Sequence, residues 1–149
     1  MKHKPVAVAP PEAGGGGPIN MLGCKLDAAA GFVLEGKISL PKPLGAPRGL
    51  YIEHGKGAGT AILFHSDGHA ELGPVGADGE GFKPDKTVDR EMRFGVPARF
   101  RLILKGALLE IYLDDFLIEC YSLPAPATGQ IGLIPGNQRS SIGALKAWR

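Results

Sequence analysis

Long apolar runs are absent from this sequence of 149 residues, and none approaches the roughly 18 residues that a membrane-spanning helix requires. The stretch Val6–Ala9 is too short to be the core of a secretory signal peptide. The sequence therefore predicts a soluble chain without an export signal, and it leaves open whether the chain is secreted as part of a larger protein. Blocks of like charge are also missing, because 17 basic and 15 acidic residues are spread over the whole length. Neither a nucleic acid nor a membrane is expected as a partner.

Cysteine is scarce, and neither Cys24 nor Cys120 lies in a Cys-x-x-Cys or Cys/His pattern with the spacing of zinc ligands. We expect no metal site and no organic cofactor. His65 and His69 flank a Ser-Asp-Gly turn, for which a solvated turn is the preferred interpretation over a metal site. A structural calcium ion stays open, because several loop aspartates are present without the spacing of a calcium loop. A Cys24–Cys120 disulfide also stays open.

The common catalytic motifs are missing as well. The sequence contains no Gly-x-Ser-x-Gly, no His-Glu-x-x-His and no phosphate-binding loop. It also lacks any stretch of ten or more residues with helical periodicity and capping residues. Enzymes that depend on these motifs, and folds that depend on helices, are therefore not predicted.

Glycine and proline are abundant, with 23 and 13 residues, and most of them separate short runs of alternating apolar and polar residues. Such runs are typical of half-buried strands. We expect strands at 31–40, 50–53, 60–64, 69–72, 91–96, 98–105, 108–113, 116–122, 130–134 and 141–148, and a long loop over Gly73–Asp89. This pattern predicts an all-β, antiparallel two-sheet jelly-roll sandwich over residues 20–149. Residues 1–19, which contain four consecutive glycines, are expected to be a flexible Pro/Gly-rich arm or linker.

The segment from Ala98 to Ile134 carries the strongest signal, because it aligns as a meander with two-residue turns at Gly106-Ala107 and Asp114-Asp115. In this alignment one face of the sheet is entirely apolar and includes Cys120. A slip of one residue would mix the two faces, so the pattern specifies the register. The apolar face is predicted to comprise Phe100, Leu102, Leu104, Leu109, Ile111, Leu113, Phe116, Ile118 and Cys120.

The opposite, polar face supplies the candidate functional residues. Planar polar side chains and aromatic rings are the groups that hold sugars, and they are predicted to gather here. The candidate carbohydrate-binding residues are Arg101, Glu110, Tyr112, Glu119 and Tyr121. In the predicted register Glu110 faces Glu119 at about 5 Å, a spacing compatible with a retaining glycosidase. The alternative is a solvated outer face, on which Arg101 and Lys105 offset the repulsion between the two glutamates.

The pattern in which ARFRLILKGALLEIYLDDFLIECYSL continues into GQIGLI and ends in IGALKAW resembles the C-terminal half of concanavalin A-like (laminin G-like) jelly-roll sandwiches. It is similar in particular to the non-catalytic sandwich attached to glycoside hydrolases of the invertase and levanase type, and to fructan-binding relatives. The resemblance is clearest over residues 98–149. It implies a module that holds polysaccharide near a catalytic domain or packs against that domain. It assigns no sugar, because no ligand-binding motif matches residue by residue.

We therefore expect a non-catalytic carbohydrate-binding module, lectin-like in character, whose partner is a polysaccharide or oligosaccharide and whose neighbour is a catalytic domain. The first alternative is a structural or interaction domain of a carbohydrate-active enzyme. A small glycosidase is the second. No catalytic residue is assigned.

Overall fold

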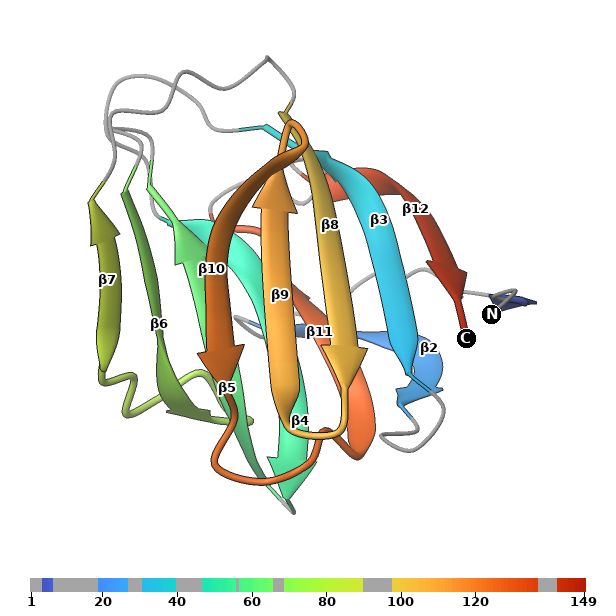
Figure 1. Cartoon of the computed structure of the whole chain (residues 1–149). Helices are drawn as coiled ribbons and strands as arrows, with labels where there is room; N and C mark the ends of the chain where they lie inside the picture. Colours follow the sequence, from blue (N-terminus) through green and yellow to red (C-terminus); the bar gives the residue numbers. More distant parts are fainter. Residues whose placement is uncertain are drawn as a thin grey trace.

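The structure is a computed structural model that describes residues 4–6, 19–26, 31–39, 47–55, 57–65, 69–89, 98–136 and 142–149. These residues form strands, turns and connecting segments, and none of them lies in a helix that would be long and apolar enough to cross a membrane. Two antiparallel sheets pack face to face (Figure 1). The predicted all-β sandwich is confirmed.

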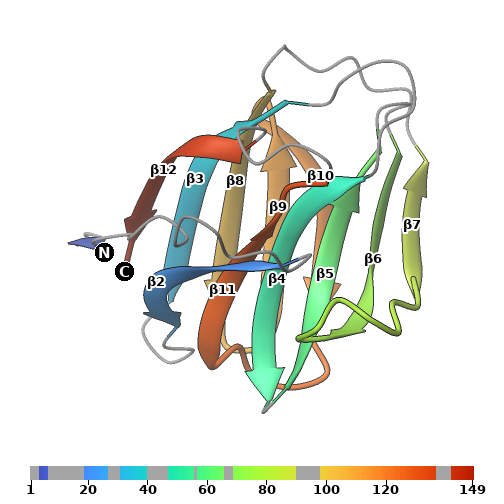
Figure 2. The ribbon, with the colours of Figure 1, turned by 180° about the vertical axis from the view of Figure 1, so that it is seen from behind.

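We call the two sheets A and B. In the part of the chain that the structure describes, each sheet has six strands. Sheet A has the order β1 (Pro5–Val6), β12 (Ile142–Trp148), β3 (Phe32–Ile38), β8 (Ala98–Lys105), β9 (Leu108–Leu113) and β10 (Phe116–Ser122). Sheet B has the order β2 (Asn20–Leu26), β11 (Gly129–Ile134), β4 (Arg48–Gly55), β5 (Ala58–Phe64), β6 (His69–Gly76) and β7 (Lys86–Asp89). Sheet A contains β8, β9 and β10 and lies in front in Figure 1, and sheet B contains β4, β5 and β6 and lies in front in Figure 2, which shows the molecule from behind.

The register between β8 and β9 agrees with the sequence prediction at every pair, from Phe100 with Leu113 to Lys105 with Leu108. Both predicted turns are present. Asp114 and Asp115 adopt the left-handed backbone conformation, with φ of 46° and 68°, and Gly106 has a φ of 61°. Asp is one of the few side chains that tolerate this conformation, so the local sequence fixes the β9–β10 hairpin.

The prediction for β10 is wrong beyond Leu117, because a bulge between Leu117 and Glu119 shifts the strand by one residue. Cys120 therefore pairs with Glu110 and is exposed as a free thiol, whereas the sequence placed it on the apolar face. Phe116, also assigned to the apolar face, is 68% exposed at the end of this edge strand.

The core lies between the sheets and is built mainly from alternate residues of their strands. From sheet A it takes Phe32, Leu34, Ile38, Phe100, Leu102, Leu104, Leu109, Ile111, Leu113 and Ile118, and from sheet B Leu22, Leu50, Ile52, Ile62, Phe64, Ala70, Leu72, Val88, Ile131 and Leu133. Arg48 is also buried, and its guanidinium donates a hydrogen bond to the carbonyl of Ser39. Burial lowers the pKa of Arg48 from its ordinary value.

A second apolar cluster lies on the outer face of sheet B, around Tyr51, Ala61 and Val75. The connection between β6 and β7 covers it with Ala77 and Phe82. This region corrects the sequence prediction of one long loop over Gly73–Asp89, because β6 extends to Gly76 and β7 occupies Lys86–Asp89. The missed strand, Lys-Thr-Val-Asp, has a single apolar residue, Val88, which belongs to the core.

Part of the predicted arm over residues 1–19 makes contacts with the sandwich. Pro5 and Val6 form β1, which pairs with Trp148 and Ala147 of β12. Ile19, the last residue of the predicted arm, packs against the Tyr51 cluster. Residues 1–3 and 7–18 of the arm and the predicted strand at 91–96 lie outside the described residues.

Replacing Ile111 by alanine should destabilise the fold, because this side chain is fully buried at the centre of the meander. The cavity should cost about 2 to 5 kcal/mol in the free energy of unfolding. Leu108→Ala is the matched control on the same strand, since Leu108 is 47% exposed and its loss should change stability little. Urea denaturation measures both midpoints. A midpoint of Ile111→Ala equal to that of the parent would mean that Ile111 does not lie in the core.

The bulge in β10 predicts that Cys120 reacts with a thiol reagent in the folded protein. In a Cys24→Ser background a single thiol remains, and we expect 5,5′-dithiobis(2-nitrobenzoate) to label it without denaturant. Labelling that begins only when urea unfolds the chain would show that Cys120 faces the core and that the bulge does not form.

Candidate functional site

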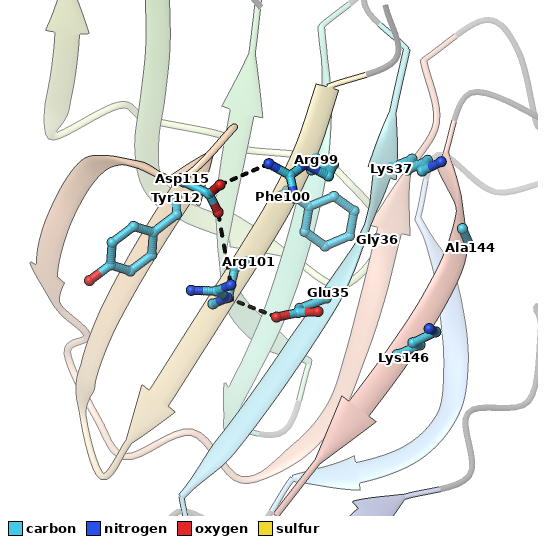
Figure 3. A pocket seen from close by; sticks show the side chains of 10 residues that line it. All are labelled: Glu35, Gly36, Lys37, Arg99, Phe100, Arg101, Tyr112, Asp115, Ala144 and Lys146. Carbon is cyan, nitrogen blue, oxygen red and sulfur yellow. Dashed lines mark hydrogen bonds and ion pairs between the residues drawn. The ribbon is translucent and has the colours of Figure 1, made fainter. Parts of the chain in front are cut away.

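A pocket of about 320 Å³ lies on the outer face of sheet A, over β12, β3, β8 and β9. The strands that form its floor place polar residues outward at alternate positions. Ten residues line it, and Figure 3 shows their side chains: Glu35, Gly36, Lys37, Arg99, Phe100, Arg101, Tyr112, Asp115, Ala144 and Lys146.

Two arginines hold the two carboxylates of the pocket in place. Arg101 Nε lies 2.8 Å from Glu35 Oε1, and Arg99 Nη2 lies 2.8 Å from Asp115 Oδ2. Arg101 Nη2 also lies 3.9 Å from Asp115 Oδ1, so one chain of ion pairs runs from Glu35 to Arg99 (Figure 3). Exposed ion pairs contribute little to stability, and in this network they orient four planar polar side chains toward one another.

The pocket carries an excess of two positive charges, because four basic side chains and two carboxylates line it. Lys37 and Lys146 make no ion pair with any residue that the structure describes. In the backbone register, Lys146 of β12 stands opposite Glu35 of β3, and Lys37 of β3 stands opposite Arg99 of β8. Their ammonium groups are therefore available to a ligand on the β3 and β12 side of the pocket.

Gly36 lies in the floor of the pocket, opposite Phe100 on the neighbouring strand β8. A Cβ atom at this position would lie 2.7 Å from two ring atoms of Phe100, closer than side chains approach each other. Phe100 is 2% exposed and fills the space that a side chain at position 36 would take. The ring of Phe100 thus forms part of the pocket floor between β3 and β8 (Figure 3).

Tyr112 supplies the aromatic group at the β9 side of the pocket. Its hydroxyl donates a hydrogen bond of 3.0 Å to Glu110 Oε2. This bond is the main cause that raises the pKa of Tyr112, and partial burial adds to it. Glu110 does not line the pocket, so its effect on the pocket passes through the tyrosine ring that it restrains.

Glu119 and Tyr121, the other two predicted site residues, lie elsewhere. The bulge places them opposite Ile111 and Leu109, whose side chains face the core, so both point toward sheet B. Glu119 Oε2 lies 3.9 Å from Lys86 Nζ, and the Tyr121 hydroxyl donates to Asp85 at 2.8 Å. These contacts join the open edges of the two sheets. The predicted pairing of Glu110 with Glu119 is therefore wrong, and with it the geometry proposed for a glycosidase.

Sequence reasoning found Arg101 and Tyr112 but missed most of their pocket partners. Glu35 and Lys37 were visible as polar positions of an alternating strand, yet nothing in the sequence indicated that β3 pairs with β8. Asp115 was identified as a turn residue, and its side chain reaches both arginines from that turn. Lys146 comes from the last strand, beside a bulge between Gly143 and Lys146.

No protein-family model matches the sequence, and no curated protein sequence matches it. Solved structures do match the fold. The carbohydrate-binding module CBM66 from Bacillus subtilis has a TM-score of 0.62 at 15% identity, with 87% of this chain and 76% of that chain covered. Sheep galectin-11, in complex with glycerol, has a TM-score of 0.61 at 12% identity over 95% and 99% of the two chains.

A toad ovary galectin in complex with thio-digalactose has a TM-score of 0.56 at 12% identity, covering 82% of this chain and 92% of that one. At such low identity the likeness concerns the fold. The chain has the concanavalin A-like jelly-roll sandwich that the sequence predicts.

The contact between Tyr121 and Asp85 should make stability depend on alkaline pH. Burial, and then the hydrogen bond to Asp85, raise the pKa of Tyr121 from 10.0 to about 12. The stabilisation is therefore complete below pH 10 and is lost as the pH rises from 10 toward 12. We expect the difference in Tm between the parent and Tyr121→Phe to shrink over this window. A difference that stays constant up to pH 12 would contradict the raised pKa of Tyr121.

Proposed function

We propose that the protein is a non-catalytic carbohydrate-binding domain and that the pocket on the outer face of sheet A holds the saccharide. The observation that carries the proposal is the arginine and carboxylate network beside Tyr112. Fixed planar polar groups suit pairs of adjacent sugar hydroxyls, and an aromatic ring suits the apolar face of a sugar ring. The network requires little rearrangement before binding, which reduces the entropic cost of association.

The solved structures of similar fold support the same class of function. They include a carbohydrate-binding module and galectins, one of them in complex with thio-digalactose. Glu110 and Glu119 do not stand opposite each other, so the pair of carboxylates on which the glycosidase alternative depended is missing. This also supports a function without catalysis.

The charge of the pocket favours a saccharide with carboxylate or sulfate groups over a neutral one. The two carboxylates are already engaged by arginine, whereas Lys37 and Lys146 have no ionic partner in the described part of the chain. A negative group on the ligand would meet these two ammonium groups at the β3 and β12 side while its ring contacts Tyr112. We infer an acidic oligosaccharide as the ligand class.

A second candidate function, an interaction domain, draws support from one observation. Leu117 lies beside Tyr112 on the outer face and is 43% exposed, and Leu108 on the same face is 47% exposed. Exposed leucines at the β9–β10 side would suit the surface of another protein domain. Failure of the parent protein to retain any saccharide would favour this function over the first.

The test compares polysaccharides that share a backbone and differ in charge, such as polygalacturonate and its methyl ester, in affinity electrophoresis. Arg101→Ala should weaken retention by one to two decades, since loss of a charged hydrogen-bond partner costs about 1.5 to 3 kcal/mol. Lys105→Ala is the matched control, because it removes the same charge from the same face of β8 outside the pocket. Tyr112→Ala should act like Arg101→Ala.

Equal retention of the parent, Arg101→Ala and Tyr112→Ala would exclude this face as the binding site. An equal loss of retention in Arg101→Ala and in Lys105→Ala would indicate that the polysaccharide is attracted by overall charge alone. Release of reducing sugar by the parent would contradict the proposed absence of catalysis. Preference for the methyl ester would leave carbohydrate binding intact and overturn the inference of an acidic ligand.

A further inference from the structure

Two histidines and a glutamate converge on the outer face of sheet B, on the side of the sandwich opposite the pocket. His65 directly follows β5, and His69 and Glu71 belong to β6. Leu63 pairs with Glu71, and His65 donates its backbone N–H to the carbonyl of His69 at 2.9 Å. Because side chains alternate along a strand, this register turns all three side chains to the same face.

The three side chains are close enough to share one ion. His65 Nε2 lies 2.6 Å from Glu71 Oε1, and His69 Nε2 lies 3.9 Å from the same oxygen. The imidazole rings stack with centroids 3.9 Å apart and planes inclined by 10°. One ligand atom from each residue lies within 4.8 Å of the others. Each side chain is about one quarter exposed, so an ion can reach them from solvent.

The donor set selects the kind of ion. Two imidazole nitrogens and one carboxylate oxygen are ligands of Zn²⁺ and of neighbouring divalent transition metals, which bind at about 2.0 to 2.2 Å. Ca²⁺ and Mg²⁺ require mostly oxygen ligands and are not suited to this cluster. Three protein ligands would leave the fourth tetrahedral position to water or to another ligand.

We propose that His65, His69 and Glu71 form a binding site for a divalent transition-metal ion, with Zn²⁺ as the probe of choice. The ion takes the place of the proton that links His65 Nε2 to Glu71 and draws His69 Nε2 toward the same point. The site depends on neither the saccharide nor the pocket, because it lies on the other sheet. It also joins the end of β5 to β6 and therefore stabilises this hairpin.

The test uses the untagged full chain, stripped of metal by a chelator and titrated with ZnCl₂ in a calorimeter. We expect saturable binding of one ion per chain and a rise in Tm of about 5 to 10 °C at a hundredfold excess over Kd. MgCl₂ and CaCl₂ should leave Tm unchanged. Co²⁺ should give the visible absorbance of a site with nitrogen and oxygen ligands.

Loss of a residue that only hydrogen-bonds to a metal ligand weakens metal binding by about 10- to 100-fold. His65→Gln and His69→Gln each remove a ligand itself and should therefore weaken Zn²⁺ binding by at least this factor. His54→Gln is the matched control, because His54 bonds to Thr60 and lies outside the cluster. Circular dichroism and the metal-free Tm verify that each variant folds. Absence of saturable heat in the parent, or undiminished Zn²⁺ binding in both His65→Gln and His69→Gln, would overturn the proposal.

Discussion

The antiparallel register that joins β3, β8 and β9 is the constraint on which both the core and the pocket depend. Along these strands every second residue is apolar, so one register sends Leu34, Leu102 and Ile111 into the sandwich. The same register sets Glu35 beside Arg101 and Arg101 beside Tyr112 on the outside. A slip of one residue would bury the charged groups, so burial of the core fixes the order of the polar groups on the other face.

The sequence was sufficient to predict the fold class, the two turns of the meander and every pair between β8 and β9. These features depend on alternation and on residues such as Asp114 that favour a left-handed turn. The bulge in β10 was not predicted, because Leu117 and Ile118 are both apolar and either can face the core. Ile118 is buried, Leu117 remains exposed, and the residues that follow change sides. One ambiguous pair thus displaced Cys120, Glu119 and Tyr121.

The remainder of the pocket could not be predicted because it depends on contacts between distant segments. Glu35 and Arg101 are 66 residues apart, and their ion pair exists only because β3 lies next to β8. The histidine cluster is a contrasting case. Its third member, Glu71, lies two residues after His69 on the same face of one strand, so the alternation used elsewhere in the chain could have identified it.

The bulge in β10 also affects how the sandwich meets other chains. An edge strand offers unpaired backbone donors and acceptors to which a strand of another molecule can add. In β10 the bulge interrupts that row, and on the opposite sheet the edge strand β7 is only four residues long. The contacts of Tyr121 with Asp85 and of Glu119 with Lys86 further occupy the space between the two edges. This side of the sandwich is therefore a poor template for a further strand, which hinders growth of either sheet from the β10 and β7 edges.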